Sequence, residues 1–297
     1  MFDGFTTKHL HYTPPDPAYV ACNPSVHFDG HTWRCIVRCI NYRLGVSVPT
    51  KPDTINVMLT LDPDKDFEII SAQPMADITG VPKSGYAITG FEDCRLFTWQ
   101  GRLWASATTC HLTPKGNREL VLLAIDSNYA FVECKPLRGP WSNYFQKNWM
   151  PCVDGDNLRF VYSIDRSIVF GVNHAGEVGN YAMEMGAVKH ASGLIWRAVG
   201  NHRGSSQCLK TPNGQRLVLV HGEGYQSKFM MLEGESYRPT HQTKFFNFRH
   251  PGVEFSAGMT AFDNFKTVAV SFSVKDATTE LGFFPIESVM QKMERIT

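Results

Sequence analysis

The sequence lacks a strong charge of either sign, because its 29 lysines and arginines nearly balance its 28 aspartates and glutamates. No overall electrostatic potential is therefore available to hold a nucleic-acid backbone or an anionic membrane surface, and neither is expected as a partner. The sequence also lacks a run approaching the roughly 20 apolar residues of a membrane span, and its N-terminus shows no basic start followed by an apolar stretch. These absences predict a cytoplasmic protein.

Several motifs of catalysis and metal binding are missing as well. The eight cysteines are dispersed, and none forms the CxxC pairs of a zinc ribbon, so we expect reduced, buried thiols, no metal and no cofactor. The sequence has no G-x-S-x-G and no H-E-x-x-H, which leaves serine hydrolases and zinc proteases unsupported. Long amphipathic helical patterns are also nearly absent, which argues against a helical fold.

Short alternating runs rich in Val, Ile, Phe, Tyr and Thr are present instead, separated by Gly, Asp, Asn and Pro. One turn-and-strand pattern recurs five times, as in FDGHTWRCIVR and WQGRLWASATT, at intervals of 50 to 71 residues. Its turn position holds residues that adopt the positive φ angles of tight hairpins, namely Gly30, Gly101, Gly155, Gly214 and Asn264. The spacing suits four-stranded blades with variable loops.

The predicted fold class is therefore all-β, a five-bladed β-propeller. Residues 1–297 are expected to form one domain, with residues 1–20 as an N-terminal extension. A β-sandwich, which can also carry regularly spaced hairpins, is the alternative.

In a propeller, equivalent ends of the repeated strands converge on one mouth of the central channel. Polar residues stand at those ends in this sequence, and they include Arg38, His111, Asp165, His221, Glu223 and Asp276. The convergence predicts a ligand site at that mouth. A lone histidine at a strand end, such as His221, is otherwise more often structural.

The segment GFEDCRLF places Glu92, Asp93 and Arg95 within four residues. Two carboxylates beside a guanidinium in a partly dry place have separated pKa values, which suits acid/base catalysis or binding of sugar hydroxyls. The alternative is an arginine-carboxylate clamp between blades.

Two further segments combine groups that could bind a sugar or an anion. In QKNWMP, the ring of Trp149 could stack on a pyranose while Lys147 and Asn148 bond its hydroxyls or an anion, although a lone tryptophan is more often part of the core. In HRGSSQ, His202 and Arg203 begin a polar loop able to hold an oxyanion, for which a solvated turn is the alternative.

The order of these motifs resembles glycoside hydrolase family 130. ACNPSVHFDGHTWRCIVR is similar to the opening blade of that family, GFEDCRLF to its Glu-Asp-Pro-Arg motif, KNWMP to a following Asn- and Pro-containing segment, and LVLVHGEGYQSKFMMLEG to its Tyr-His-Gly strand. The tail VAVSFSVKDATTELGFFPIESV resembles its closing blade, so the likeness spans roughly residues 20 to 290. It implies a five-bladed propeller that acts on β-linked mannosides by phosphorolysis or by inverting hydrolysis.

The resemblance also implies roles for individual residues. It places Asn23, Arg38, Glu92, Asp93 and Arg95 around the bound sugar, and Lys147 and His221 near phosphate or the attacking water. His111 stands at the aligned position of the family's general acid, where the family has an aspartate, and Cys94 replaces the proline of the Glu-Asp-Pro-Arg motif.

The leading hypothesis is an inverting glycosidase or glycoside phosphorylase acting on a mannoside-like glycan. Asp93 is expected nearest the reacting sugar, with Glu223 as the base if water attacks. If inorganic phosphate is the co-substrate, Lys147, His202, Arg203 and His221 are expected to bind it, and Asp165 and Asp276 are expected to line the same pocket. A glycosyltransferase of related architecture and a non-catalytic glycan-binding module are the alternatives, and a homo-oligomer is compatible with each.

Overall fold

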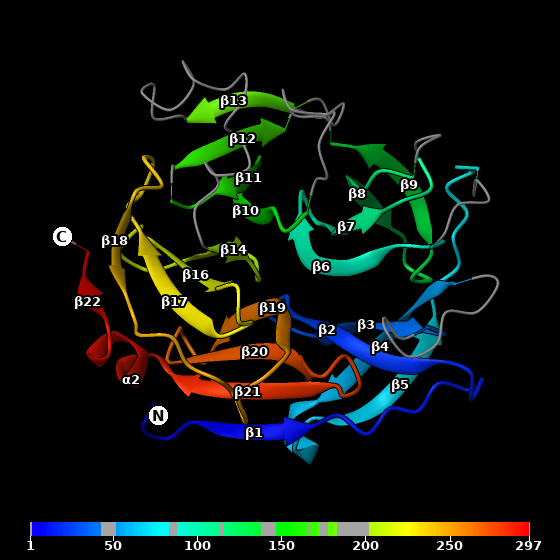
Figure 1. Cartoon of the computed structure of the whole chain (residues 1–297), viewed down its shortest axis with the longest axis horizontal. Helices are drawn as coiled ribbons and strands as arrows, with labels where there is room; N and C mark the ends of the chain where they lie inside the picture. Colours follow the sequence, from blue (N-terminus) through cyan, green and yellow to red (C-terminus); the bar gives the residue numbers. More distant parts are fainter. Residues whose placement is uncertain are drawn as a thin grey trace.

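The computed structural model describes residues 2–42, 52–82, 88–112, 116–137, 147–165, 167–172, 178–182 and 202–296. Five antiparallel sheets stand in a ring around a central axis, as Figure 1 shows. The chain runs from the innermost strand of each sheet outward before it crosses to the next one. The fold is a five-bladed β-propeller, which confirms the predicted fold class.

Each blade is built from consecutive strands. The first contains β2 (Val20–Phe28), β3 (Trp33–Ile40), β4 (Thr54–Asp62) and β5 (Glu68–Pro74), with the short η1 (Pro63–Lys65) between the last two. The second contains β6 (Glu92–Trp99), β7 (Arg102–Thr109), β8 (Glu119–Ile125) and β9 (Phe131–Pro136). The third contains β10 (Met150–Asp154), β11 (Asn157–Ser163), β12 (Ile168–Val172) and β13 (Val178–Ala182).

The last two blades are completed by the chain termini. The fourth contains the short pieces β14 (Arg203–Gly204) and β15 (Leu209–Lys210), then β16 (Arg216–His221), β17 (Ser227–Leu232), β18 (Pro239–Gln242) and β22 (Glu294–Arg295). The fifth contains β19 (Glu254–Phe262), β20 (Thr267–Val274), β21 (Glu280–Pro285) and, on its outside, β1 (Thr6–His9). Helix α2 (Ile286–Gln291) connects β21 to β22.

The five predicted turn residues occupy the same place in every blade, between the innermost strand and the second one. All have a positive φ: 98° at Gly30, 68° at Gly101, 58° at Gly155, 82° at Gly214 and 53° at Asn264. Only glycine and asparagine adopt this region at low cost, which explains the recurring residue choice.

The recurring strand is the second strand of each blade, and the innermost strand precedes the turn. This differs from the expectation that the repeated strands themselves surround the channel. Because a hairpin reverses direction, the end of the second strand and the beginning of the innermost strand lie at the same mouth. The predicted convergence therefore holds, and it includes the residues that begin β2, β6, β10, β14 and β19.

The N-terminal segment, expected as an extension, supplies the outer strand of the fifth blade. Strand β1 pairs with β21 in antiparallel register from Thr6 opposite Phe283 to His9 opposite Glu280. At the other end of the chain, β22 pairs with β18 of the fourth blade. Both termini thus fill strand edges that would otherwise be open to water, and β1 closes the ring between the first and last blades.

The core consists mainly of five apolar clusters, each lying between two neighbouring blades. The cluster between the third and fourth blades, for example, joins Cys152 and Val161 to Val218 and Tyr237. Because every sheet packs on both faces, most inner strands are buried almost continuously rather than on alternate residues. Within the described residues, no helix is long and apolar enough to cross a membrane.

Candidate functional site

The candidate site lies at the channel mouth where the innermost strands begin. The pairing of β2 with β3 shifts register between Cys22 and Ser25, and the pairing of β6 with β7 shifts between Glu92 and Arg95. These bulges contain Asn23 at φ 45° and Asp93 at φ 52°. Asparagine and aspartate tolerate the left-handed region better than other residues with a Cβ, and such strained positions cluster at functional sites.

Asp93 is the centre of a buried polar cluster. Its Oδ1 accepts a hydrogen bond of 2.9 Å from Nδ2 of Asn23 and one of 2.7 Å from Nη1 of Arg38. Ser273, near the end of β20, in turn donates to Oδ1 of Asn23 at 2.5 Å. The cluster therefore joins the first, second and fifth blades around one carboxylate.

Arg38 also binds the neighbouring carboxylate. Its Nη2 lies 3.3 Å from Oε1 of Glu92 and donates to the hydroxyl of Tyr42, which donates to Oε1 of Glu92 at 3.1 Å. Arg38, Glu92 and Asp93 are each less than a tenth exposed. No sequence motif marked Tyr42, although this residue follows the end of β3, where polar residues were expected.

The charges of the cluster hold Asp93 ionised. Burial raises the pKa of this carboxyl, but Arg38, Lys147, the hydrogen bond from Asn23 and Arg95 together outweigh burial and hold the pKa well below its ordinary value. Burial likewise lowers the pKa of Arg38, and the attraction of Asp93 and Glu92 raises it well above its ordinary value. Both groups are charged throughout the physiological range.

Asp276 behaves in the opposite way. It follows β20 at φ 50°, and burial together with the nearby charge of Asp93 raises the pKa of its carboxyl, against the opposing effects of Arg38, Asn23 and Lys147. Two carboxylates in one site thus have pKa values displaced in opposite directions. Such a separation favours an ionised role for Asp93 and an acid role for Asp276.

Arg95 fixes the backbone beside this cluster. It is fully buried and donates from Nε to the carbonyl of Ser205 at 2.8 Å and from Nη2 to Oδ1 of Asn148 at 3.2 Å and the carbonyl of Gly204 at 3.3 Å. Its Nη1 donates to the carbonyl of Asp93 at 3.3 Å. Burial lowers the pKa of Arg95 to about 10. Arg95 therefore joins the innermost segments of three blades.

The close approach of the third and fourth blades requires Gly204. A Cβ at this position would lie 2.3 Å from the carbonyl oxygen of Asn148, so a larger residue would push the two segments apart. Asn148 itself has φ 62°. The backbone geometry of these two segments thus holds the side chain of Asn148 within hydrogen-bonding distance of Arg95, and both residues were predicted for the site.

Positive charges surround His221 on the fourth-blade side of the site. Its Nδ1 lies 2.8 Å from Oγ of Ser205, and its ring is parallel to that of Tyr225 at 5.8 Å between centroids. Burial, Arg95, Arg203 and Lys147 lower the pKa of His221 to about 3, with only Asp93 acting in the other direction. The imidazole is therefore neutral and lies in a cationic environment.

Lys147 connects the two halves of the site. Its side chain is exposed, and its charge acts to lower the pKa values of Asp93, Asp276 and His221 alike. Its ammonium is therefore close enough to all three groups to act on their charges. Arg203, also exposed, is directly opposite His221 in the register of β14 and β16.

Asp165 and His202 form a pair at the rim. Oδ1 of Asp165 lies 2.6 Å from Nδ1 of His202, and the imidazole stacks on Phe245 at 5.7 Å. Phe245 is 39% exposed and lies against Gly222, where a Cβ would meet the ring at 3.1 Å. The pair therefore neighbours His221 but is separate from the carboxylates around Asp93.

Of the three remaining predicted site residues, one lies in the core and two follow the second strands of their blades. Trp149 is 1% exposed and packs against Phe160 and Phe170 in the core between the second and third blades, so its face is not available to a sugar. His111 is buried beside Phe91, and its Nδ1 lies 2.7 Å from Oγ1 of Thr109. Glu223 is exposed in the turn that follows β16.

The described residues contain no group of three or more His, Cys, Asp or Glu side chains arranged to hold a metal ion. All eight cysteines are free, and seven of them are buried. The groups that this mouth presents are carboxylates, cationic side chains and a neutral imidazole.

Neither a protein-family model nor a curated protein matches the sequence. Solved structures do match the fold. The β-1,2-mannobiose phosphorylase from Listeria innocua superimposes with a TM-score of 0.67 at 12% identity, over 97% of this chain and 99% of the other. A structure described for mannoside phosphorylases and hydrolases of the GH130 family, that is, glycoside hydrolase family 130, gives 0.64 at 11% identity, over 91% and 85%.

A third match is MPT-1, a GDP-Man-dependent mannosyltransferase from Leishmania mexicana. Its TM-score is 0.53 at 12% identity, over 94% of this chain and 90% of the other. The chain therefore has the five-bladed fold of the glycoside hydrolase family 130 propellers, and the resemblance expected from the sequence is confirmed for the fold. The three matched structures carry different chemistries on that fold.

Proposed function

We propose that this protein is a carbohydrate-active enzyme that acts with inversion on a β-mannoside-like glycan and uses inorganic phosphate as its co-substrate. One observation carries the proposal: two carboxyl groups, Asp93 with a lowered pKa and Asp276 with a raised pKa, both lie close enough to Lys147 for its charge to affect them. The same charge also acts on His221. Cleavage of a glycosidic bond needs a pair of carboxyl groups such as Asp93 and Asp276, and binding of phosphate needs cationic side chains such as Lys147. The match to a mannobiose phosphorylase of the same fold supports the choice of substrate class.

The two carboxyl groups take different roles in this mechanism. Asp93 stays ionised and is fixed by Asn23 and Arg38, so it suits an acceptor of hydrogen bonds from sugar hydroxyls close to the reacting carbon. Asp276 retains its proton to a higher pH and suits the general acid. It donates that proton to the glycosidic oxygen as the bond from C1 breaks.

Phosphate attacks C1 from the opposite face, which forms a sugar 1-phosphate with inverted configuration. An anionic nucleophile of this kind needs no base, unlike the water of a hydrolase. Lys147 and Arg203 offer two exposed cations for it. The hydroxyl of Ser205 hydrogen-bonds to Nδ1 of the neutral His221. The other ring nitrogen, Nε2, can therefore form a hydrogen bond with a phosphate or sugar oxygen.

The test is incubation with a panel of β-mannosides, with and without phosphate, followed by product analysis. We expect a mannose 1-phosphate to form only when phosphate is present. Free mannose formed at the same rate without phosphate would instead identify a hydrolase with a water nucleophile. Binding of the glycans without any turnover would identify a glycan-binding module.

A matched pair of lysine variants tests the phosphate site itself. Lys147→Met is expected to raise the KM for phosphate roughly 10- to 100-fold, because a hydrogen bond to a charged group contributes about 1.5 to 3 kcal/mol. Lys244→Met, at an exposed lysine of the fourth blade that lies 3.8 Å from Glu294, is the control. An unchanged phosphate KM in Lys147→Met would remove this residue from the phosphate site.

The second candidate is a mannosyltransferase that uses an activated donor. It is favoured by the match to MPT-1 and by the same cationic group, which would also suit the phosphates of a sugar nucleotide. Adding GDP-mannose and an acceptor glycan to the panel separates this reaction, since transfer would then occur without inorganic phosphate.

A further inference from the structure

A second polar cluster lies between the third and fourth blades, away from the carboxylates of the candidate site. It contains two cysteines, Cys152 on β10 and Cys208 just before β15, both of them free. The amide of Cys208 donates to the carbonyl of Pro151 at 2.8 Å, which holds the two segments side by side. Both side chains belong to the apolar cluster between these two blades.

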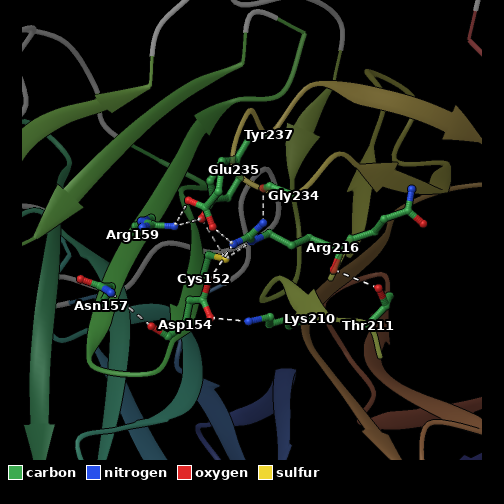
Figure 2. Close-up of polar contacts among 11 residues, drawn as sticks. Cys152, Asp154, Asn157, Arg159, Lys210, Thr211, Arg216, Gly234, Glu235 and Tyr237 are labelled. Carbon is green, nitrogen blue, oxygen red and sulfur yellow. Dashed lines mark hydrogen bonds and ion pairs between the residues drawn. The ribbon is translucent and has the colours of Figure 1, made fainter. Parts of the chain in front are cut away.

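Arg216 is directed at the sulfur of Cys152, as Figure 2 shows. Its Nε donates to Sγ at 3.2 Å, and the hydroxyl of Tyr237 lies 3.5 Å from the same atom. The guanidinium lies 4.3 Å from the centroid of the Tyr237 ring and is 1% exposed. A buried cation and two hydrogen-bonding partners around one sulfur stabilise its thiolate.

Arg216 is itself held in place from two sides. Its Nη2 lies 3.0 Å from Oδ2 of Asp154 and 3.5 Å from Oε1 of Glu235, and Nη1 donates to the carbonyl of Gly234 (Figure 2). The guanidinium therefore cannot turn away from Cys152 without breaking several contacts. A fixed donor of this kind suits a reactive sulfur better than a mobile surface lysine does.

The two thiols differ in the way that a reactive pair requires. The neighbouring thiol of Cys208 lowers the pKa of Cys152 in spite of burial, and Tyr237 and Arg216 act in the same direction. Burial and the neighbouring sulfur raise the pKa of Cys208 well above its ordinary value. By contrast, burial raises the pKa of Cys134 to about 12 and that of Cys39 to about 12.

A small reagent can approach the pair from the far end of the channel. A cavity of 260 Å³ lies at the mouth opposite the candidate site and is lined by Pro151, Val153 and Cys208, among other residues that end the innermost strands. Cys208 is 7% exposed and Cys152 is 1% exposed. Cys208 therefore borders the space that a molecule of the size of a peroxide can enter, and Cys152 lies between two other lining residues of that space, Pro151 and Val153, in the chain. The low exposure of both thiols disfavours bulky alkylating reagents.

We propose that Cys152 and Cys208 form an oxidation-sensitive dithiol, in which a small peroxide converts the two thiols into a disulfide between the third and fourth blades. The Cys152 thiolate attacks one peroxide oxygen, the O–O bond breaks, and a sulfenic acid forms while the released hydroxide takes up a proton. The Cys208 sulfur then attacks Cys152. The S–S bond forms, the S–O bond breaks, and the departing hydroxide leaves as water with the Cys208 proton. One hydrogen peroxide is reduced to two waters as two thiols become one disulfide.

The disulfide would join the same two segments that Arg95 bridges at the candidate site. Asn148 lies four residues before Cys152, and Ser205 lies three residues before Cys208. A second cross-link between these segments restricts their separation in the folded protein and the freedom of the chain between them in the unfolded one. The expected consequence is a more stable propeller in the oxidised form.

The experiment is a titration of the reduced, full-length protein with hydrogen peroxide. We expect one equivalent to remove two thiols per chain, and a non-reducing proteolytic digest to yield a peptide pair linked through Cys152 and Cys208. The melting temperature should rise by roughly 5 to 10 °C and return after reduction by dithiothreitol. A linked pair other than this one, or oxidation of Cys134 ahead of it, would overturn the proposal.

Single variants identify the order of events. Cys208→Ser should stop at a sulfenic acid on Cys152, which dimedone traps, and Cys152→Ser should consume little peroxide. Cys134→Ser is the matched control and should behave as the wild type does, since Cys134 lies on the outer strand β9. Equal peroxide consumption by all three variants would show that the pair has no special reactivity. The mapping in the wild-type protein does not depend on whether a variant folds.

Discussion

Arg38, on the second strand of the first blade, donates a 2.7 Å hydrogen bond from Nη1 to Oδ1 of Asp93, on the innermost strand of the second blade. The same ion pair therefore links two blades and fixes the carboxylate at the centre of the candidate site. The sequence left two roles open for GFEDCRLF: an acid/base or sugar-binding group, and an arginine-carboxylate clamp between blades. This geometry is compatible with both roles at once. Mutations in the pair must be judged by turnover and stability together.

Asp93→Asn is expected to reduce glycan turnover by roughly 10- to 100-fold while the protein stays folded, because the sugar hydroxyls lose a charged hydrogen-bond acceptor. The amide can still accept a hydrogen bond from Arg38, and Glu92 still offsets the guanidinium charge at 3.3 Å. The loss of stability should therefore be smaller than the roughly 3 to 5 kcal/mol typical of removing one partner from a buried ion pair. Rates and urea denaturation should be measured on the same preparations.

Asp29→Asn is the matched control for this variant. Asp29 also pairs with an arginine, Arg34, but in the hairpin that precedes β3, at the opposite end of the blade from the site. It should keep near-normal turnover. If Asp93→Asn also keeps near-normal turnover, Asp93 acts only as the interblade clamp.

Asp276→Asn tests the general acid through the leaving group. Glycans whose leaving alcohol needs a proton should lose turnover by two or more orders of magnitude, whereas 4-nitrophenyl β-mannoside, whose leaving group needs none, should lose much less. In the wild type, kcat/KM for glycans should fall as the pH rises through the pKa of Asp276, because the protonated form is the active one. A loss that is equal for both substrates would contradict an acid role.

Glu223→Gln examines the base predicted from the sequence. If phosphate is the nucleophile, phosphorolysis should persist in this variant, since no base is required. If water is the nucleophile and Glu223 activates it, release of free mannose should be lost. The two products therefore report on the two mechanisms separately.

The fold was predictable because its signals are local. A positive-φ turn residue followed by an apolar strand recurs five times, and no tertiary information is needed to see it. Strand β1 was not predictable in this way, because the four residues TTKH have no apolar face and are ordered by pairing with β21. Its role depends on a partner more than 270 residues away in the sequence.

The site was predictable as a set of segments but less so as individual side chains. The strand ends that carry Arg38, His221 and Asp276 were located by position, since hairpin geometry brings them to one mouth. The sequence could not predict that the pKa values of Asp93 and Asp276 are displaced in opposite directions, because these displacements arise from burial and from charges on other segments. Trp149 was misplaced because its polar neighbours face the mouth while its own ring faces the interblade core.

Trp149→Ala should destabilise the protein by about 3 to 5 kcal/mol, as expected for a large aromatic side chain removed from a packed core. The ring packs against Phe160, Tyr162 and Phe170 in the core between the second and third blades. Trp149→Phe should recover much of the stability and leave the KM for the glycan unchanged. A rise in KM without a loss of stability would instead place the ring in the sugar site, as the sequence suggested.

Two histidines, the half-buried His27 and the buried His221, predict how stability depends on pH. Burial lowers the pKa of His27 to about 4 and that of His221 to about 3, from an ordinary value of 6.5 that applies in the unfolded chain. Between these values the unfolded chain binds protons that the folded protein does not, so the free energy of unfolding falls as the pH falls below about 6.5. Each histidine contributes up to about 1.4 kcal/mol per pH unit in that window. Below the ordinary pKa of aspartate, the depressed pKa of Asp93 adds a further loss in the same direction.

Urea denaturation between pH 7 and pH 4.5 measures this dependence. His27→Asn and His221→Gln should each flatten the curve over the histidine window, even if they lower the stability at pH 7, because a side chain that cannot protonate no longer favours the unfolded state in acid. His31→Asn, in the exposed hairpin turn before β3, is the control and should leave the slope as it is in the wild type. An unchanged slope in the double variant of His27 and His221 would mean that both imidazoles are already able to protonate inside the folded propeller, and that the acid sensitivity arises from the carboxylates alone.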